Sequence, residues 1–174
     1  MSGCGCDGTS GGSCGCSTRS ESAVGCPLCG ATGRKVGSLT LRSQLRPEAL
    51  ARLNASLETF NFCTNPDCPN VYYDESRSAT VGKDALKSRV TLKDNDPKTP
   101  LCYCKKLLKE DFYAMVREGE PDIAGKIKAI IAGGRSFCEK SNPKGVCCTE
   151  DVARFLADHG LAWEQEESGA KECC

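Results

Sequence analysis

Fifteen cysteines among 174 residues constrain this chain more than any other feature of its sequence. Cysteine at this density is typical of small folds that are held together by cross-links or bound metal. The chain begins without the apolar stretch of a signal peptide, and no apolar run approaches the roughly 20 residues that span a bilayer. We therefore expect a cytoplasmic protein without membrane insertion, in which metal ligation is the default role of reduced thiols.

The charge balance argues against several classes of function. Lys and Arg number 23, Asp and Glu also number 23, and the net charge is zero, so no basic field is available for nucleic acid. The sequence contains one histidine and shows neither a nucleophile-base constellation nor a phosphate-binding loop. We expect a protein that does not bind nucleic acid and is not an enzyme.

The composition divides the chain into four segments. Residues 1–22 are almost entirely Gly, Ser, Thr and Cys, and residues 164–174 are charged, so both are expected to be flexible tails. Residues 23–98 and 99–163 lie between them, with a polar, proline-containing linker at 93–100. The expected fold class is α+β, with a small mixed zinc-bound module followed by a short-helix [2Fe-2S] domain and flexible Cys-bearing tails.

Local patterns predict the elements of each half. In the first half we expect strands at 36–41, 71–73 and 89–92, and a helix at 46–53 with Pro47 in its first turn. In the second half we expect helices at 109–119, 121–131 and 149–160, with a Gly-rich loop at 133–148. Thr149 is the predicted N-cap of the last helix, Gly160 its end, and His159 a partner of its C-terminus.

Two closely spaced cysteine pairs in the first half predict a metal site. Cys26 and Cys29 flank a tight turn that ends in Gly30, and Cys63 and Cys68 enclose the turn-forming sequence Thr-Asn-Pro-Asp. Four thiolates without an open position are typical of a structural zinc ion, although a mononuclear iron site uses the same ligands. Buried free thiols or a redox pair are the non-metal alternative.

A second set of thiols occurs in the other half. Cys102-x-Cys104 precedes one predicted helix, whereas Cys138 and the pair Cys147-Cys148 precede another, so helix N-termini favour an anionic centre there. A [2Fe-2S] cluster needs two thiolates on each iron and tolerates the one-residue spacing of the first pair. A second zinc site or unligated thiols are the alternatives.

These motifs carry a resemblance to known families. Cys102-x-Cys104 followed by Cys138 resembles the [2Fe-2S] domain of bacterioferritin-associated ferredoxins and of NifU-type proteins, although those ferredoxins close with Cys-x-x-Cys. With the CPLCG and FCTNPDCPNVYY segments, residues 24–160 resemble the N-terminal region of archaeal CopZ-type copper chaperones. The resemblance implies zinc on the four cysteines of the first half and a [2Fe-2S] cluster on Cys102, Cys104, Cys138 and one of Cys147 or Cys148.

The resemblance leaves two points open. Of the last two thiols we prefer Cys147 as the ligand, because Cys148 can then pack at the start of the helix near Thr149. CopZ chaperones of this type also carry a heavy-metal-associated domain with a Met-x-Cys-x-x-Cys loop, which does not occur in this sequence. The six remaining tail cysteines are soft ligands that could bind Cu(I) instead, or could be low-complexity sequence without a selected role: Cys4, Cys6, Cys14, Cys16, Cys173 and Cys174.

The sequence therefore supports two main functional hypotheses. The first is a metal-handling redox protein with zinc, a [2Fe-2S] cluster and tail thiols for Cu(I), whose partner would be a metal-transport ATPase or a redox protein. The second is a ferredoxin-like electron-transfer partner of a larger oxidoreductase or iron-storage protein. An iron-sulfur sensor or assembly scaffold is a third. Because the two thiol sets lie on different segments, the sequence predicts that they bind metal independently.

Overall fold

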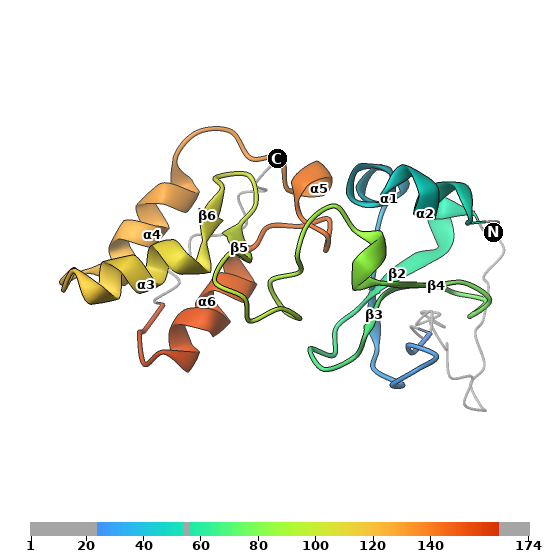
Figure 1. Ribbon diagram of the computed structural model, residues 1–174, viewed down its shortest axis with the longest axis horizontal. Helices are drawn as coiled ribbons and strands as arrows, with labels where there is room; N and C mark the ends of the chain where they lie inside the picture. The colour runs from blue at the N-terminus through green and yellow to red at the C-terminus, as the bar shows by residue number, and fades with distance from the viewer. Residues whose placement is uncertain (1–23, 54–55, 164–174) are drawn as a thin grey trace, which may run out of the picture.

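The computed structural model describes residues 24–53 and 56–163. The two predicted tails, with their six cysteines, lie outside the described residues. A sheet with two helices lies at one end of the long axis, and three further helices with a small hairpin lie at the other (Figure 1). The fold is thus a mixed α+β structure, as the sequence predicts.

The first half is built on a four-stranded antiparallel sheet in the order β1-β2-β3-β4. Phe62 lies opposite Arg34 on one side and Tyr72 on the other. The short 3-10 helices Leu57–Thr59 and Lys83–Ala85 lead into and out of the sheet. Its strands are β1 (Gly33–Lys35), β2 (Phe60–Cys63), β3 (Asn70–Asp74) and β4 (Thr80–Gly82).

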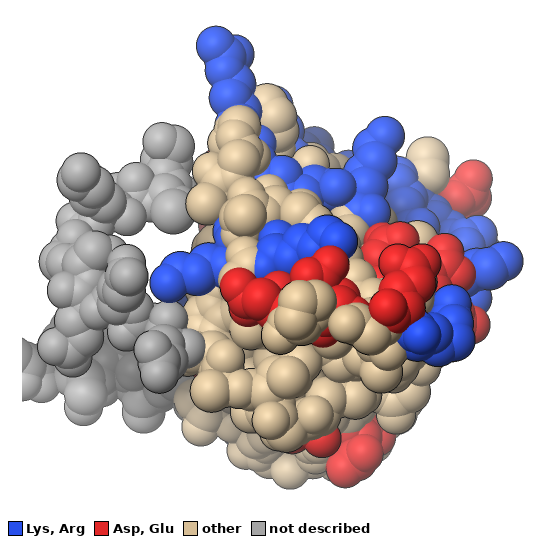
Figure 2. Space-filling view, turned by 90° about the vertical axis from the view of Figure 1, so that its left-hand side faces the viewer, with Lys and Arg blue, Asp and Glu red and all other residues tan. Residues whose placement is uncertain are grey.

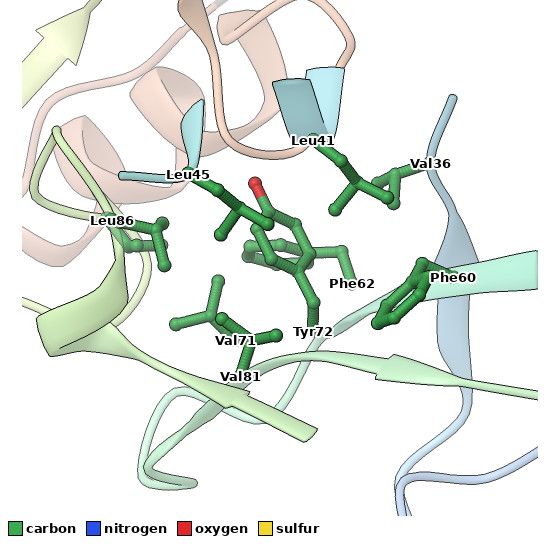
Figure 3. Packing of buried hydrophobic residues seen from close by; sticks show 10 residues of the cluster. Val36, Leu41, Leu45, Phe60, Phe62, Val71, Tyr72, Val81 and Leu86 are labelled. Carbon is green, nitrogen blue, oxygen red and sulfur yellow. The ribbon is translucent and has the colours of Figure 1, made fainter. Parts of the chain in front are cut away.

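Two helices pack on this sheet, α1 (Ser38–Gln44) and α2 (Pro47–Ala51). Pro47 occupies the first turn of α2, as predicted, where its missing N–H costs no hydrogen bond. Leu41 and Leu45 point from α1 and its end toward Phe62 and Tyr72 (Figure 3). The core of this half consists of Val36, Leu41, Leu45, Phe60, Phe62, Val71, Tyr72, Val81, Leu86 and Val90.

Two of the predicted strands are wrong. The segment 36–41 was expected to be extended, but α1 begins at Ser38, because Leu41 and Leu45 repeat at the four-residue spacing of a helix face. The segment 89–92 forms a turn instead, since the N–H groups of Lys93 and Asp94 both donate to the Val90 carbonyl at 2.9 Å. Short apolar runs do not distinguish these alternatives by pattern alone.

The second half confirms the three predicted helices as α3 (Lys109–Arg117), α4 (Ile123–Ala132) and α6 (Thr149–Asp158). It adds the hairpin β5 (Pro100–Cys102) and β6 (Leu107–Leu108), and the single turn α5 (Cys138–Ser141). Gly160 ends α6 with a φ of 74°, but Cys148 rather than Thr149 holds its N-cap position. The buried core of this half consists of Leu101, Cys102, Leu107, Phe112, Ile123, Ile127, Cys148, Val152 and Leu156.

No helix in the described ranges is both long enough and apolar enough to cross a lipid bilayer.

Candidate metal centres

The first cysteine pair lies on a turn that is closed by the antiparallel bridge between Gly25 and Thr32. The Gly30 N–H donates to the Cys26 carbonyl at 2.8 Å, and the Cys26 N–H donates to the Ala31 carbonyl at 2.9 Å. Gly30 has a φ of 72°, a conformation that side-chain-bearing residues rarely adopt. The predicted glycine turn therefore exists and directs both thiols to one side.

The second pair is held between two strands of the sheet. Cys63 is the last residue of β2, and Cys68 lies two residues before β3 begins. The Asn65 side-chain oxygen accepts a hydrogen bond from the Asp67 N–H at 3.0 Å. The backbone carbonyl of Asn65 accepts another from the Cys68 N–H at 3.3 Å. The Asn-Pro-Asp sequence thus forms the turn that brings the two thiols together.

The structure places all four of these sulfur atoms within 4.8 Å of one another. The Sγ atoms of Cys26 and Cys68 are 3.9 Å apart, and those of Cys29 and Cys63 are 3.6 Å apart. A tetrahedron with metal–sulfur bonds of about 2.3 Å has sulfur–sulfur edges of about 3.8 Å. Three of the thiols are buried and Cys29 is partly exposed, so the site fits a single zinc ion shielded from solvent.

Polar groups around this site favour thiolates. Burial alone would raise the pKa of the Cys26 thiol, but hydrogen bonds from the Leu28 and Cys29 N–H groups and from the Asn70 side chain lower that pKa to about 7. At Cys63 burial dominates and raises the pKa to about 12. A bound cation would offset that burial cost, since metal binding displaces the thiol protons.

Lys93 is a neighbour of the zinc site that sequence reasoning missed. It is buried, and its ammonium donates to the Asn65 carbonyl and, at 3.1 Å, to the Cys68 carbonyl. Its positive charge also lowers the pKa of the Cys63 thiol against the effect of burial. Lys93 lies in a stretch that reads as a polar linker, so only the folded structure reveals this role.

The second set of thiols gathers at the hairpin and two loops of the other half. Cys102 ends β5, and its Sγ lies 3.7 Å from that of Cys104. Cys138 begins α5, and Cys147 and Cys148 precede α6. The side chains of Cys104 and Cys138 interact, as do those of Cys138 and Cys147. The five predicted thiols are therefore linked as a series of neighbouring pairs.

Cys147 and Cys148 differ in their surroundings. Cys148 is buried in the core, and interaction with its thiol lowers the pKa of Cys102 to about 6 and raises the pKa of Cys148. Cys147 is partly exposed, and its sulfur lies 2.9 Å from the Thr149 hydroxyl. Hydrogen bonds from Cys148 and then from Thr149 lower the pKa of Cys147 to about 4. Cys148 thus lies beside Cys102 within the core, whereas Cys147 is partly exposed and interacts with Cys138.

One side of this second set reaches the surface. Phe137, next to Cys138, is 56% exposed. The Lys105 ammonium donates to the Arg135 carbonyl at 2.9 Å, which joins the loop after Cys104 to the loop before Phe137. At this end of the molecule, Lys and Arg side chains gather in the upper part of the view, with Asp and Glu across its middle and lower edge (Figure 2). The exposed Phe137 ring and the joined loops of Lys105 and Arg135 thus adjoin Cys138 and Cys104 in the chain.

His159 acts as the sequence predicts. Its Nδ1 lies 2.7 Å from the Phe155 carbonyl in the last turn of α6, and its ring lies 4.3 Å from the Phe155 ring. These contacts place the histidine at a helix end.

Comparisons with known proteins agree with this arrangement. Residues 23–87 match the model of a family described as a zinc binding domain of the CopZ type. The copper chaperone CopZ of Archaeoglobus fulgidus is 30% identical over 133 residues, which are 75% of this chain and 60% of that protein. This chain therefore spans less than two thirds of the length of that relative.

A solved structure gives the same result for the fold. The X-ray structure of the Archaeoglobus fulgidus CopZ N-terminal domain is similar with a TM-score of 0.61 and 25% identity. The similarity covers 79% of this chain and 98% of that domain. The described fold thus resembles the CopZ N-terminal domain, and its first half is a CopZ-like zinc-binding region.

Proposed function

We propose that this chain is a metal-handling redox protein in which Cys26, Cys29, Cys63 and Cys68 hold a structural zinc ion. The observation that carries the proposal is the convergence of these four sulfur atoms within 4.8 Å, inside the segment that matches a zinc binding domain. Four thiolates fill the tetrahedral positions of the metal, which leaves none for a substrate. Zinc at this site contributes folding energy to the first half.

The second thiol set would hold a [2Fe-2S] cluster, which supplies one-electron chemistry when bound. Its support is the 3.7 Å separation of Cys102 and Cys104, which suits two thiolates on one ion, together with the interaction of Cys102 with Cys148 and of Cys104 with Cys138. Cys138 would provide the third ligand. We assign the fourth to Cys148 rather than Cys147, because Cys148 is buried beside Cys102 while Cys147 is bonded to Thr149.

Copper handling is the finer part of the proposal. The A. fulgidus relative is a copper chaperone, but this chain spans 60% of its length. The six tail cysteines would bind Cu(I), since thiolates favour soft monovalent ions. The partner would then be a metal-transport ATPase or another metal-accepting protein.

Metal analysis of the anaerobically purified protein tests the proposal as a whole. One zinc and two iron atoms per chain, with the visible absorption of a [2Fe-2S] cluster, are expected. Two zinc atoms and no iron would contradict the cluster assignment and leave the zinc site intact.

Removing the tails should separate copper binding from the rest of the molecule. Deletion of residues 1–20 with Cys173 and Cys174 is expected to lower Cu(I) binding, measured against a thiol competitor, because six soft ligands are lost. Zinc and iron contents should stay unchanged. If the Cu(I) stoichiometry and affinity also remain unchanged, the tails do not carry copper.

Electron transfer to a partner is the second candidate function. It is favoured by the exposed Phe137 ring and by Lys105, Lys106 and Arg135 beside the partly exposed thiols. These groups would receive an acidic surface on a redox partner, because complementary charge steers encounter.

Charge reversal at this surface should slow a reaction with an anionic oxidant. In the double variant Lys105→Glu/Lys106→Glu, oxidation of the reduced protein by ferricyanide is expected to be several-fold slower at low salt, with a smaller salt dependence. The reaction is followed by stopped-flow absorbance, and Arg52→Glu at the end of α2 serves as the control. Equal rates in all three proteins would argue against docking at this surface.

A further inference from the structure

We infer that the zinc-bound half positions the cysteine loops of the second half, so that zinc binding at the first site strengthens metal retention at the second. The inference rests on the proposed function. It is carried by two separate sets of polar contacts that join the halves, one at the loop after Cys138 and one at the loop between Cys102 and Cys104.

The first set of contacts runs from α1 to α5. The Thr40 hydroxyl donates to the Glu139 carbonyl at 2.8 Å, and the Gln44 side-chain amide donates to the Lys140 carbonyl at 2.6 Å. Both donors are polar residues with 0% and 3% exposure, respectively. Their acceptors directly follow Cys138 in a helix of four residues, which is too short to be stable by itself. The first half therefore fixes the turn that presents Cys138.

The rest of this loop is held by the sheet. The hydroxyl of Tyr72, a fully buried residue of β3, donates to the Pro143 carbonyl at 2.7 Å. Gly145 has a φ of 70°, and a Cβ atom there would come within 2.7 Å of the Thr40 hydroxyl oxygen. Such a close approach requires glycine at this position. The loop from Cys138 toward Cys148 thus packs directly on the zinc-bound half.

The second set of contacts passes through the turn at residues 90–94. Lys93 donates to the Asn65 and Cys68 carbonyls of the zinc site. Two residues earlier, the Thr91 N–H donates to the Tyr103 hydroxyl at 2.9 Å, and that hydroxyl donates to the Arg89 carbonyl at 2.9 Å. Tyr103 lies between Cys102 and Cys104. One short turn thereby connects the zinc knuckle to the first thiol pair of the second site.

Loss of zinc should weaken the second site because both sets of contacts start from the half that carries the zinc ligands, and α1 packs on the sheet whose strands flank these ligands. Cys63 ends β2 and Tyr72 lies on β3, and the carbonyl acceptors of Lys93 lie in the turn between these two strands. If the two cysteine turns separate when zinc is lost, these donors and acceptors lose their fixed positions. Coupling between two sites requires such an element, whose state biases both.

The experiment compares variants that remove the contacts without removing a metal ligand. The double variant Thr40→Val/Gln44→Met keeps the volume of both side chains but loses their donors. Tyr72→Phe loses only a hydroxyl. Thr59→Val is the matched control, because its hydroxyl donates to the Ser56 carbonyl within the first half. Each full-length protein is prepared with zinc bound, and its zinc content and melting temperature are recorded.

Two readouts test the inference. In iron-loaded protein, iron release to a chelator should be on the order of ten-fold faster in the double variant, since two buried hydrogen bonds to the loop are missing. In zinc-loaded, iron-free protein, alkylation of Cys138 by iodoacetamide, measured by peptide mass spectrometry, should rise by a similar factor. Tyr72→Phe should show a smaller rise in both, and Thr59→Val none.

The alkylation readout keeps this inference separate from the proposed function. If the protein holds no iron, the cluster assignment fails, but alkylation of Cys138 still reports whether the zinc-bound half positions the loop. Wild-type alkylation rates in the folded, zinc-loaded double variant and in Tyr72→Phe would overturn the inference. Removal of zinc from the wild-type protein should give an increase at least as large as that in the double variant, and an unchanged rate would also overturn it.

Discussion

Replacement of Cys63 by serine should remove zinc from the protein and unfold its first half. Cys63 is fully buried at the end of β2, and its sulfur lies 3.6 Å from that of Cys29. Structural zinc sites bind with about 10–16 kcal/mol, which is comparable to the whole stability of a small domain. We expect less than one tenth of the wild-type zinc content by metal analysis and loss of the cooperative thermal transition by circular dichroism.

The same variant tests whether the two metal sites are independent or coupled. The spacing of the cysteines alone predicts that the second site is unaffected, whereas the contacts from Thr40, Gln44 and Tyr72 predict that it also loses iron. Cys147→Ser, which alters a thiol outside the zinc site, is the matched control and should keep its zinc. Full zinc content and a wild-type melting temperature in Cys63→Ser would contradict a structural zinc ion.

If the second site holds the proposed [2Fe-2S] cluster, replacement of Cys104 by serine should abolish that cluster while the protein keeps its zinc. Cys104 forms the 3.7 Å pair with Cys102, so one iron would lose a thiolate. The expected result is loss of the visible absorption and of nearly all iron, with close to one zinc per chain. The first half retains zinc in this variant because it has its own core around Phe62 and Tyr72.

Serine variants of the last two cysteines identify the fourth ligand. Cys148→Ser should lose the cluster as Cys104→Ser does, whereas Cys147→Ser should retain most of its iron with a modest change in the spectrum. The reverse pattern would assign the ligand to Cys147.

For Cys104→Ser, the contradicting outcome is an equal loss of zinc and iron. That result would show that neither half folds without the other.

The sequence is informative wherever the signal is local. Both cysteine pairs of the zinc site can be recognised because each is enclosed in one short turn, and α3, α4 and α6 can be recognised from their periodic apolar faces. The strand β2 was missed because all four of its residues are buried, which removes the alternation that marks a half-exposed strand.

The parts that could not be predicted depend on contacts between distant residues. Lys93 lies in a polar stretch and Tyr103 between two predicted ligands, but their hydrogen-bond partners lie 25 and 14 residues away, respectively, so the local sequence does not indicate these contacts. Thr40 and Gln44 look like solvent-facing polar residues until α5 packs against them, 99 and 96 residues later. Tertiary packing rather than local propensity decides such positions.

The hydrogen bonds from the first half to the loop after Cys138 also determine which residues of that loop can be substituted. Thr40, Gln44 and Tyr72 all donate to main-chain carbonyls, at Glu139, Lys140 and Pro143. Because every residue type has a carbonyl, the side chains at 139 and 140 can be exchanged without loss of these bonds, provided that the backbone path is kept. The exposed side chains of this loop can therefore be substituted, for example to change its charge, as long as the three donors are kept.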